Sequence, residues 1–562
     1  MKCLAVLGLV LALCLAGCGE LAPPFAAKTG SLRGCLQLDD GRPAAGVEVW
    51  WEGQGASGAV VTDGEGRFGV DGLPAGTVDL VALDPARAFG WSGTARILGG
   101  RQESLGCQIM AATACLSGKM QYDQGVSPPV EVLVDGTAEW TWSRADGSFE
   151  VQVPANRCYD LTFQAINLKD RTEAFCAGEP AAPCQAERTL IAMSPSDEPE
   201  SRVWLEMPRL PVPVAEPGAA VDGTIVYVAG GHSCPAGSEC EFIEHGPGQS
   251  AALMLFDFKR PIWSLGADVP TPRSAPTGAM LDGRFHLIGG FETALDSCVV
   301  REGELGCTAE HTAINEVYDR GADRWSTGAA LDAGRSWARA VASKRAIHVI
   351  GGLGSDYYDR IGVLTPSGWT TPPAELSAGG YQMQGCAAGQ RIFAFGGLKR
   401  PNPRLADSVS EGLLGLCARR LLQFRFDIAS WDAPASPAPV HRASGNCVVL
   451  GEYLYSPGFA GGESPEPSLM YDIRRDVWTQ LPPGPGHHKV AVLPTPHGLV
   501  MLGGGQGYGD ARAEVFVSVA SRFVSRAQAL YAKGDPIEVL DHALLETNPT
   551  PQDLNVLCDG ID

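Results

Sequence analysis

The chain has 562 residues, of which 45% are hydrophobic and 19% are charged, and it carries a formal charge of −21 with a pI near 4.9. A chain of this length has more residues than one hydrophobic core ordinarily organises, which predicts several domains. Such an acidic chain lacks the basic footprint of a nucleic-acid-binding protein, so no nucleic-acid partner is expected. The 70 glycines and 41 prolines show no collagen-like period and favour a turn-rich, all-β fold.

Residues 1–18 have the pattern of an export signal. Lys2 supplies a positive charge, and the apolar stretch 4–16 is shorter than a membrane-spanning helix needs. It ends in Leu-Ala-Gly-Cys at Cys18, which resembles the bacterial lipobox. The resemblance implies lipidation of Cys18 and a membrane as partner through this anchor; an ordinary secretory peptide is the alternative. Gly19 in place of Asp favours an outer-membrane lipoprotein of the cell envelope, facing the periplasm or the surface.

Export into an oxidising compartment predicts disulfide bonds. Without Cys3, Cys14 and Cys18, an even number of 14 cysteines remains from the total of 17. Cys35 and Cys107 bracket one predicted domain, Cys115 and Cys158 lie in the next, and short separations suggest Cys176 with Cys184, Cys234 with Cys240, and Cys298 with Cys307. Zinc is the alternative, but the mature chain has no CxxC pair. We therefore expect no metal and no other cofactor.

After a linker at 19–29, strand-like runs alternate with turn residues over 30–110. The segments GRPAAGVEV (41–49), TDGEGRF (62–68) and LPAGTVDL (73–80) resemble the carboxypeptidase regulatory-like domain. The resemblance implies an immunoglobulin-like β-sandwich without catalytic residues. A diverged second copy is expected over 111–195, with Gly147 and Phe149 in the places of Gly66 and Phe68. A calcium site in these acidic turns is the alternative, but the turns lack a full set of oxygen ligands.

Diglycines recur at 230–231, 289–290, 351–352, 396–397, 461–462 and 503–504. Most are followed by an aromatic residue and then a Trp, as at Phe256 and Trp263, Tyr318 and Trp325, and Tyr471 and Trp478. These two ordered marks resemble the kelch repeat, which implies a β-propeller of four-stranded sheets over 203–520. We expect six blades. We also expect the glycines and the Trp residues to serve packing between blades rather than function.

The two ends of the repeat region predict how it closes. The last repeat has no Trp strand, and the segment around Trp204 precedes the first repeat without a diglycine, so this segment is expected to complete the last blade. The tail 521–562 has helical composition, with a stop at Gly534 and a second helix from Pro536. The final CDGID resembles the opening half of the calcium-type motifs found at the ends of many secreted bacterial proteins, and a metal role there is the alternative to a plain terminus. The predicted fold is thus all-β, with two β-sandwich domains, a six-bladed kelch-type propeller and a short helical tail.

The sequence contains no GxSxG, HExxH or P-loop motif, and we nominate no catalytic residue. The kelch resemblance places residues just before the first strand of a blade near the mouth of the channel. Four such residues are candidate ligands for an anion, or alternatively partners of acidic groups and carbonyls of the next blade: Arg273, Arg335, Arg442 and His488.

Three long connections follow diglycines, at 232–250, 291–313 and 398–420, and repeat position puts them on one face of the propeller. This face is the preferred binding surface. The sequence favours a non-enzymatic, lipid-anchored envelope protein that presents a kelch propeller to an unknown protein or glycan ligand. The alternatives are a sugar-modifying enzyme of the mutarotase or epimerase type and a purely structural envelope protein.

Overall fold

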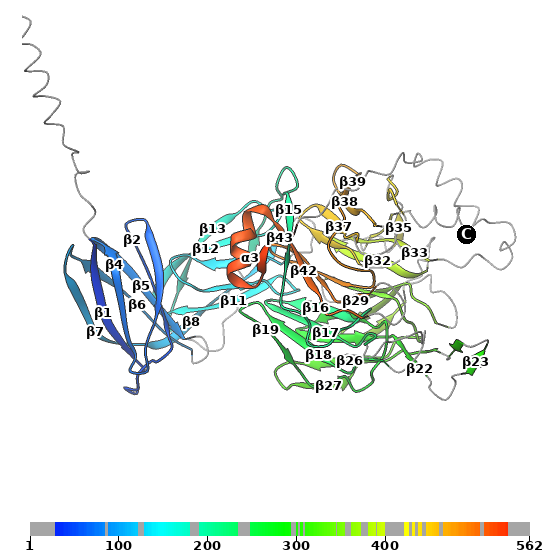
Figure 1. Ribbon diagram of the computed structural model, residues 1–562, viewed down its shortest axis with the longest axis horizontal. Coiled ribbons are helices and arrows are strands. Elements are labelled where there is room, and N and C mark those ends of the chain that lie inside the picture. The colour runs from blue at the N-terminus through cyan, green and yellow to red at the C-terminus, as the bar shows by residue number, and fades with distance from the viewer. Residues whose placement is uncertain are drawn as a thin grey trace, which may run out of the picture.

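A computed structural model gives the fold of the chain (Figure 1). It describes residues 29–537 apart from 85–87, 122–128, 180–189, 234–247, 294–298, 302–303, 307–308, 344–345, 355–360, 372–379, 389–390, 399–420, 426–429, 433–435, 441–445, 460–464 and 506–510. The described chain is all-β, with many sheets and one short α-helix, as the composition predicted. Among its helices, none is long and apolar enough to cross a membrane.

Two sheets enclose a first hydrophobic core that includes Leu36, Val49, Phe68 and Leu80. Hydrophobic residues alternate with exposed ones along these strands, because successive side chains of a strand point to opposite faces. One sheet contains β1 (Thr29–Gln37), β4 (Arg67–Pro74) and β7 (Gln102–Ile109). The facing strands are β2 (Glu48–Gly53), β3 (Ala56–Val61), β5 (Gly76–Asp84) and β6 (Phe89–Ile97).

A second core, around Phe149, Leu161 and Phe163, lies between two further groups of strands. One group contains β8 (Ala111–Gln121), β11 (Ser148–Pro154) and β14 (Leu190–Ala192), and the other β9 (Glu131–Val134), β10 (Trp140–Trp142), β12 (Arg157–Gln164) and β13 (Arg171–Ala177). β6 pairs with β8 through Phe89 and Ala112, so one seven-stranded sheet runs through both cores. We call residues 111–195 the second sandwich.

Most of the remaining strands in the described part of the chain form six sheets, numbered here in chain order. The others form two two-stranded ribbons, β22 (Phe291–Thr293) with β25 (Ala309–His311) and β23 (Val299–Arg301) with β24 (Glu304–Gly306). Sheet 1 contains β16 (Gly218–Asp222), β17 (Ile225–Ala229), β18 (Leu253–Asp257) and β19 (Arg260–Leu265); sheet 2 contains β20 (Thr277–Leu281), β21 (Arg284–Ile288), β26 (Asn315–Asp319) and β27 (Arg324–Thr327). Sheet 3 contains β28 (Arg339–Ser343), β29 (Ala346–Ile350), β30 (Ile361–Thr365) and β31 (Gly368–Thr370). Sheet 4 contains β32 (Tyr381–Ala388), β33 (Arg391–Leu398), β34 (Leu422–Arg425) and β35 (Ser430–Asp432).

Sheet 5 contains β36 (Val448–Leu450), β37 (Tyr453–Ser456), β38 (Ser468–Asp472) and β39 (Val477–Leu481), and sheet 6 begins with β40 (Ala491–Thr495) and β41 (Gly498–Leu502). The first strand of each sheet contacts the first strand of the next, and β40 contacts β16. The sheets therefore form a closed ring around a channel, consistent with a β-propeller.

Sheet 6 is completed by a strand from the start of the region. β15 (Arg202–Glu206) pairs with β42 (Val515–Ala520), with Trp204 opposite Ser518. The predicted closure by the Trp204 segment is confirmed. Closure in this way ties the two ends of the repeat region together through backbone hydrogen bonds.

The tail differs from its prediction. A 3-10 turn at Ser521–Phe523 leads into α3 (Val524–Leu530), which confirms the first helix. The chain then forms β43 (Lys533–Ile537), which pairs with the free edge of β15. The predicted stop at Gly534 and helix start at Pro536 are therefore wrong within the described residues, because an unpaired strand edge recruits this segment. The CDGID motif lies outside the described residues.

The diglycines are explained by conformation and by crowding. Gly289 and Gly290 have φ values of +63° and +100°, and the same pair of positive values recurs in sheets 1, 3, 4 and 6. A Cβ added to Gly289 would lie 2.3 Å from the carbonyl oxygen of Arg335 in the next connection. Only glycine combines this backbone conformation with so close an approach.

The repeated Trp residues link neighbouring sheets. The indole N–H of Trp325 in β27 donates to the carbonyl of Ala267, which follows sheet 1, at 2.8 Å. Trp263, Trp369 and Trp478 make the corresponding bond to the segment that follows the preceding sheet. Their role in packing between blades is confirmed.

The described residues contain three fully placed disulfides. Cys35–Cys107 joins β1 to β7, where the two residues are register partners. Cys158 pairs with Cys176 across β12 and β13, so neither Cys115 with Cys158 nor Cys176 with Cys184 is correct. Sequence separation failed here because strand register decides which cysteines meet; Cys115 is disulfide-bonded as well. Cys386–Cys447 was not nominated. Cys18, Cys184, Cys234, Cys240, Cys298 and Cys307 lie outside the described residues.

Candidate functional site: the channel of the ring and its two ends

The ring has two different ends. Because the first and second strands of each sheet are antiparallel, the start of the first strand and the diglycine at the end of the second lie at the same end. We call this end the loop face. Isolated bridges tie its connections together, for example Ala215 with His232 and Ser274 with Phe291. The ribbon of β22 (Phe291–Thr293) and β25 (Ala309–His311) projects there, on the side away from the sandwiches in Figure 1.

Arg273 is engaged inside its own sheet rather than open to the channel. Its side chain is fully buried and pairs with Glu316, which is 6% exposed, at 2.5 Å. Its remaining donors bond the carbonyls of Gly289, Thr271 and Leu287. Burial lowers the pKa of Arg273, and Glu316 opposes this shift. These bonds hold the diglycine connection of sheet 2 in place.

The other nominated residues are placed as follows. Arg335 is buried and bonds Asp332 at 2.6 Å. The ring of His488 lies 5.1 Å from that of Phe459. Arg442 lies outside the described residues. None of the three described residues, Arg273, Arg335 and His488, lies in the lining of the two cavities defined below.

The mouth of the channel is formed by a different set, which we call the collar. Five non-glycine residues with positive φ stand at equivalent positions near the start of the first strand of a sheet: Glu216 (+54°), Ala275 (+49°), Trp337 (+51°), Gln382 (+59°) and Lys489 (+63°). All five line one small cavity of about 20 Å³, together with Arg339. A conformation this unfavourable persists only where its surroundings enforce it, and it concentrates at functional sites.

Backbone hydrogen bonds between collar residues hold them in this positive-φ conformation. The N–H of Glu216 donates to the carbonyl of Lys489 at 2.8 Å, that of Trp337 to Ala275 at 3.2 Å, and that of Gln382 to Trp337 at 3.1 Å. Each bond joins one sheet to its neighbour around the ring. The collar side chains are thereby held at the channel mouth by a rigid backbone.

The collar carries mixed chemistry. Glu216 and Lys489 approach to 3.8 Å, and both are largely buried. Burial lowers the pKa of Arg339 to about 10, with the charge of Glu216 opposing the shift, so Arg339 stays cationic at neutral pH. Trp337 packs beside Phe291 of the ribbon, with ring centroids 4.9 Å apart. For Ala275 and Trp337 the sequence signal is the repeated Arg-Ser-X triplet at 273–275 and 335–337, in which they are the third residue.

The opposite end of the channel is covered by the second sandwich. The turn between β10 and β11 lies over this end of the channel. The N–H of Ala145 in that turn donates to the carboxylate of Asp222, at the end of β16, at 3.0 Å. Between this turn and the walls lies the chamber, a cavity of about 190 Å³. It is lined by residues from the first strands of all six sheets and by Pro129, Ser143, Arg144 and Ala145.

Buried polar contacts fix the second sandwich to the ring. Glu131 of β9 and His497 of sheet 6 are both fully buried and 3.0 Å apart, and Glu131 also accepts from Arg526 of α3. Burial by itself raises the pKa of Glu131, but hydrogen bonds and charge from His497 and Arg526 bring it down to about 2. His497 further contacts the hydroxyl of Tyr531 at 2.8 Å.

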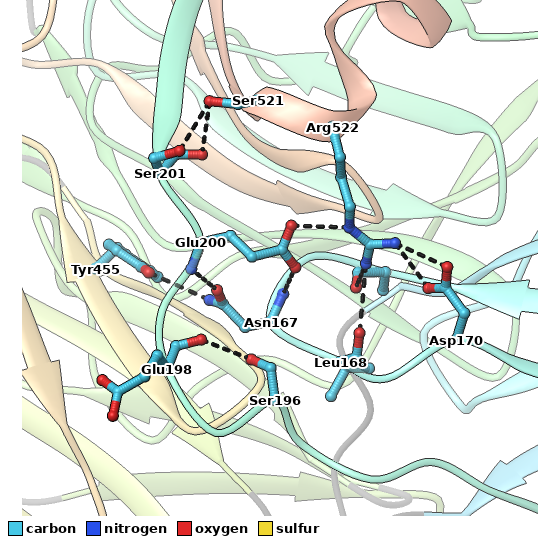
Figure 2. Close-up of polar contacts among 11 residues, drawn as sticks. Asn167, Leu168, Asp170, Ser196, Glu198, Glu200, Ser201, Tyr455, Ser521 and Arg522 are labelled. Atoms are coloured by element: carbon cyan, nitrogen blue, oxygen red, sulfur yellow. Dashed lines mark hydrogen bonds and ion pairs between the residues drawn. The ribbon is translucent and has the colours of Figure 1, made fainter.

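A second part of this joint is shown in Figure 2. The side-chain amide of Asn167 donates to the carbonyl of Leu450 and to the hydroxyl of Tyr455 in sheet 5. Asn167 and Glu200 exchange two hydrogen bonds, and Arg522 bridges Glu200 and Asp170. The second sandwich, the segment before β15 and the tail therefore meet in one network.

Comparison with known proteins gives limited matches. No protein-family model matches the chain. The F-box/kelch-repeat protein At3g27150 of Arabidopsis thaliana is 26% identical over 176 residues, which are 31% of this chain and 38% of that protein. The solved structure titled "Structure of YjhT" aligns with a TM-score of 0.40 and 16% identity over 55% of this chain and 95% of that one. The match to a kelch-repeat protein supports a kelch-type propeller in this chain.

Proposed function

We propose that this chain is a non-enzymatic, lipid-anchored protein of the cell envelope that presents a six-bladed kelch-type propeller for binding a protein or a glycan. The observation that carries the proposal is the asymmetry of the ring. The second sandwich covers one end of the channel, while the collar and the connections after the diglycines gather at the other. A ligand-binding surface made of loops on a rigid scaffold is the common use of such an end.

The collar supports binding by its composition. An acid, an amide, an aromatic ring and two bases stand around one opening, held by hydrogen bonds between their backbones. A few fixed polar groups beside an aromatic surface are typical of recognition sites. The Trp337–Phe291 pair provides the aromatic surface.

The test is a binding screen of the full chain against envelope proteins and glycans. A matched variant replaces residues 294–308 by a short turn, which keeps β22 and β25. We expect the full chain to bind at least one partner. Binding of that partner should be weaker in the 294–308 variant or in Gln382→Ala. The control is Asp282→Asn, in the turn between β20 and β21 at the opposite end of the ring, and this variant should bind normally. Turnover of a bound sugar, followed by NMR, would instead favour the enzymatic alternative.

The anchor is tested separately. Cys18→Ala removes the expected lipidated residue, so the protein should move from the membrane fraction to the soluble fraction after expression with its own leader. Metabolic labelling with a fatty acid should be lost in the same variant. Retention of both membrane association and label would refute the lipoprotein part of the proposal without touching the binding part.

A further inference from the structure

The chamber between the ring and the second sandwich is a separate cavity from the collar and serves no role in the function proposed above. Its volume of about 190 Å³ is comparable with known cavities of about 150 Å³ that hold one benzene ring. A single six-membered ring with its substituents is therefore the size of ligand that fits.

The walls of the chamber combine apolar and polar surface. Their side chains are mostly small, and those only partly buried include Ala219, Ala340, Ala342 and Ala387. Each wall is the first strand of a sheet, which in the described sheets pairs on one side. The other edge has no strand partner in the described sheets, and some of its groups bond side chains of the next sheet instead. The N–H of Ala340 donates to the hydroxyl of Thr277 at 2.7 Å, and the N–H of Gly385 donates to the amide oxygen of Asn446 at 3.5 Å.

Three side chains add hydrogen-bond donors. Ser143 accepts from the N–H of Val130 at 2.9 Å, so its hydroxyl proton is directed elsewhere. Asn446 accepts from the N–H of Cys447 at 3.0 Å through its oxygen, and its NH₂ group has no partner among the described residues. Arg144 uses one nitrogen for Glu150 at 3.0 Å and has further N–H groups.

The charge of the site is low. Arg144 is the ionisable residue among the described residues of the lining, and its charge is already matched by Glu150. A ligand that brings its own charge would lack a counter-charge in this narrow space. Neutral molecules rich in oxygen acceptors, with apolar C–H faces for the alanines, match this lining.

From these observations we propose that the chamber is a binding site for one neutral monosaccharide-sized ring, enclosed by the propeller channel and the second sandwich together. The ligand's oxygens accept from Ser143, Arg144 and Asn446, and its C–H face packs against the small side chains of the walls. If the chamber binds a sugar, the second sandwich forms one wall of a binding site and is more than a spacer.

The test uses the full chain and a panel of neutral monosaccharides, namely glucose, galactose, mannose and N-acetylglucosamine, with saturation-transfer NMR and calorimetry. We expect at least one sugar to bind. Ala342→Leu, which fills the chamber, should weaken that binding at least tenfold, and Asn446→Ala should weaken it several-fold. Ala56→Leu, at an exposed position of β3, is the matched control and should bind as the parent chain does.

Failure to bind any sugar of the panel would overturn the proposal, and so would binding that neither Ala342→Leu nor Asn446→Ala alters. Should Ala342→Leu fail to fold, Asn446→Ala and Ala219→Val decide the question. The loop-face screen is independent, because a sugar bound in the chamber is insensitive to removal of residues 294–308. The two proposals can therefore fail separately.

Discussion

At the scale of single residues, buried charges of this protein hold connections together. Arg273 and Glu316 form an ion pair that is almost completely shielded from water, and Thr271 donates a further bond to the same carboxylate at 2.9 Å. Position in the repeat nominated Arg273 as a ligand of the channel mouth. Its hydrogen bonds to three backbone carbonyls and its ion pair with Glu316 instead match the alternative, in which the arginine pairs with acidic groups and carbonyls of the ring.

Arg273→Met should therefore destabilise the fold strongly. Removing the guanidinium leaves the carboxylate of Glu316 buried without its counter-charge, which costs about 3–5 kcal/mol. The free energy of unfolding from denaturant titration measures this loss. The double variant R273M/E316L should recover part of it, and Arg260→Met on the exposed face of β19 should have little effect. A near-neutral Arg273→Met would show that the pair does not stabilise sheet 2.

The Glu131 carboxylate predicts a pH dependence. Its pKa of about 2 lies below the ordinary value of 4.5, so the folded state binds its proton less readily than the unfolded state does. The stabilisation is complete above pH 4.5 and is lost as the pH falls from there towards 2. Thermal melting across this range should show the decline, and Glu131→Gln should flatten it. An unchanged pH profile in Glu131→Gln would contradict this assignment.

At the scale of elements, the repeat explains most of the ring. Sheets 1, 2 and 5 carry an aromatic residue in the third strand, whereas the third strand of sheet 3 has none. In sheets 1, 2, 3 and 5 the Trp of the fourth strand bonds the segment that follows the preceding sheet. Tyr318 adds a second bond, from its hydroxyl to Asp323 at 2.7 Å, and Tyr471 makes the same bond to Asp476. These turns fix the outer strands so that each Trp reaches the preceding connection.

Two glycines of sheet 2 separate the effect of backbone conformation from the effect of crowding between sheets. Gly283 and Gly289 both have positive φ, but a Cβ on Gly283 meets nothing within 4 Å, whereas one on Gly289 meets the carbonyl of Arg335. Gly283→Ala should cost about 1–2 kcal/mol from backbone conformation alone. Gly289→Ala should cost clearly more, because backbone atoms must also move apart. Equal losses in denaturant titration would show that crowding between sheets contributes nothing.

At the scale of the whole molecule, closure and docking make one body of the second sandwich, the ring and the tail. β15 is held between β42 on one side and β43 on the other, and the segment before it enters the network around Asn167 (Figure 2). The collar is consequently held at the end of the ring away from the sandwiches.

A chain that ends after Ala532 should be less stable than one that ends after Ile537. The shorter chain loses β43 and leaves the edge of β15 unpaired. We expect its melting temperature to fall by about 2–4 °C, the shift that about 1 kcal/mol produces in a domain of some 200 residues. Equal melting temperatures would mean that β43 adds no stability to sheet 6.

The sequence by itself determined the all-β class, the repeat with its diglycines and Trp residues, the closure by the Trp204 segment and the Cys35–Cys107 bond. These features are readable because each depends on a local pattern that recurs or brackets a domain. Tertiary structure decided the continuous sheet through both cores, the Cys158–Cys176 bond, the strand at 533–537, the collar and the chamber. All of these arise where segments far apart in the chain meet, and such meetings depend on strand edges, register and burial, which leave no periodic mark in the sequence.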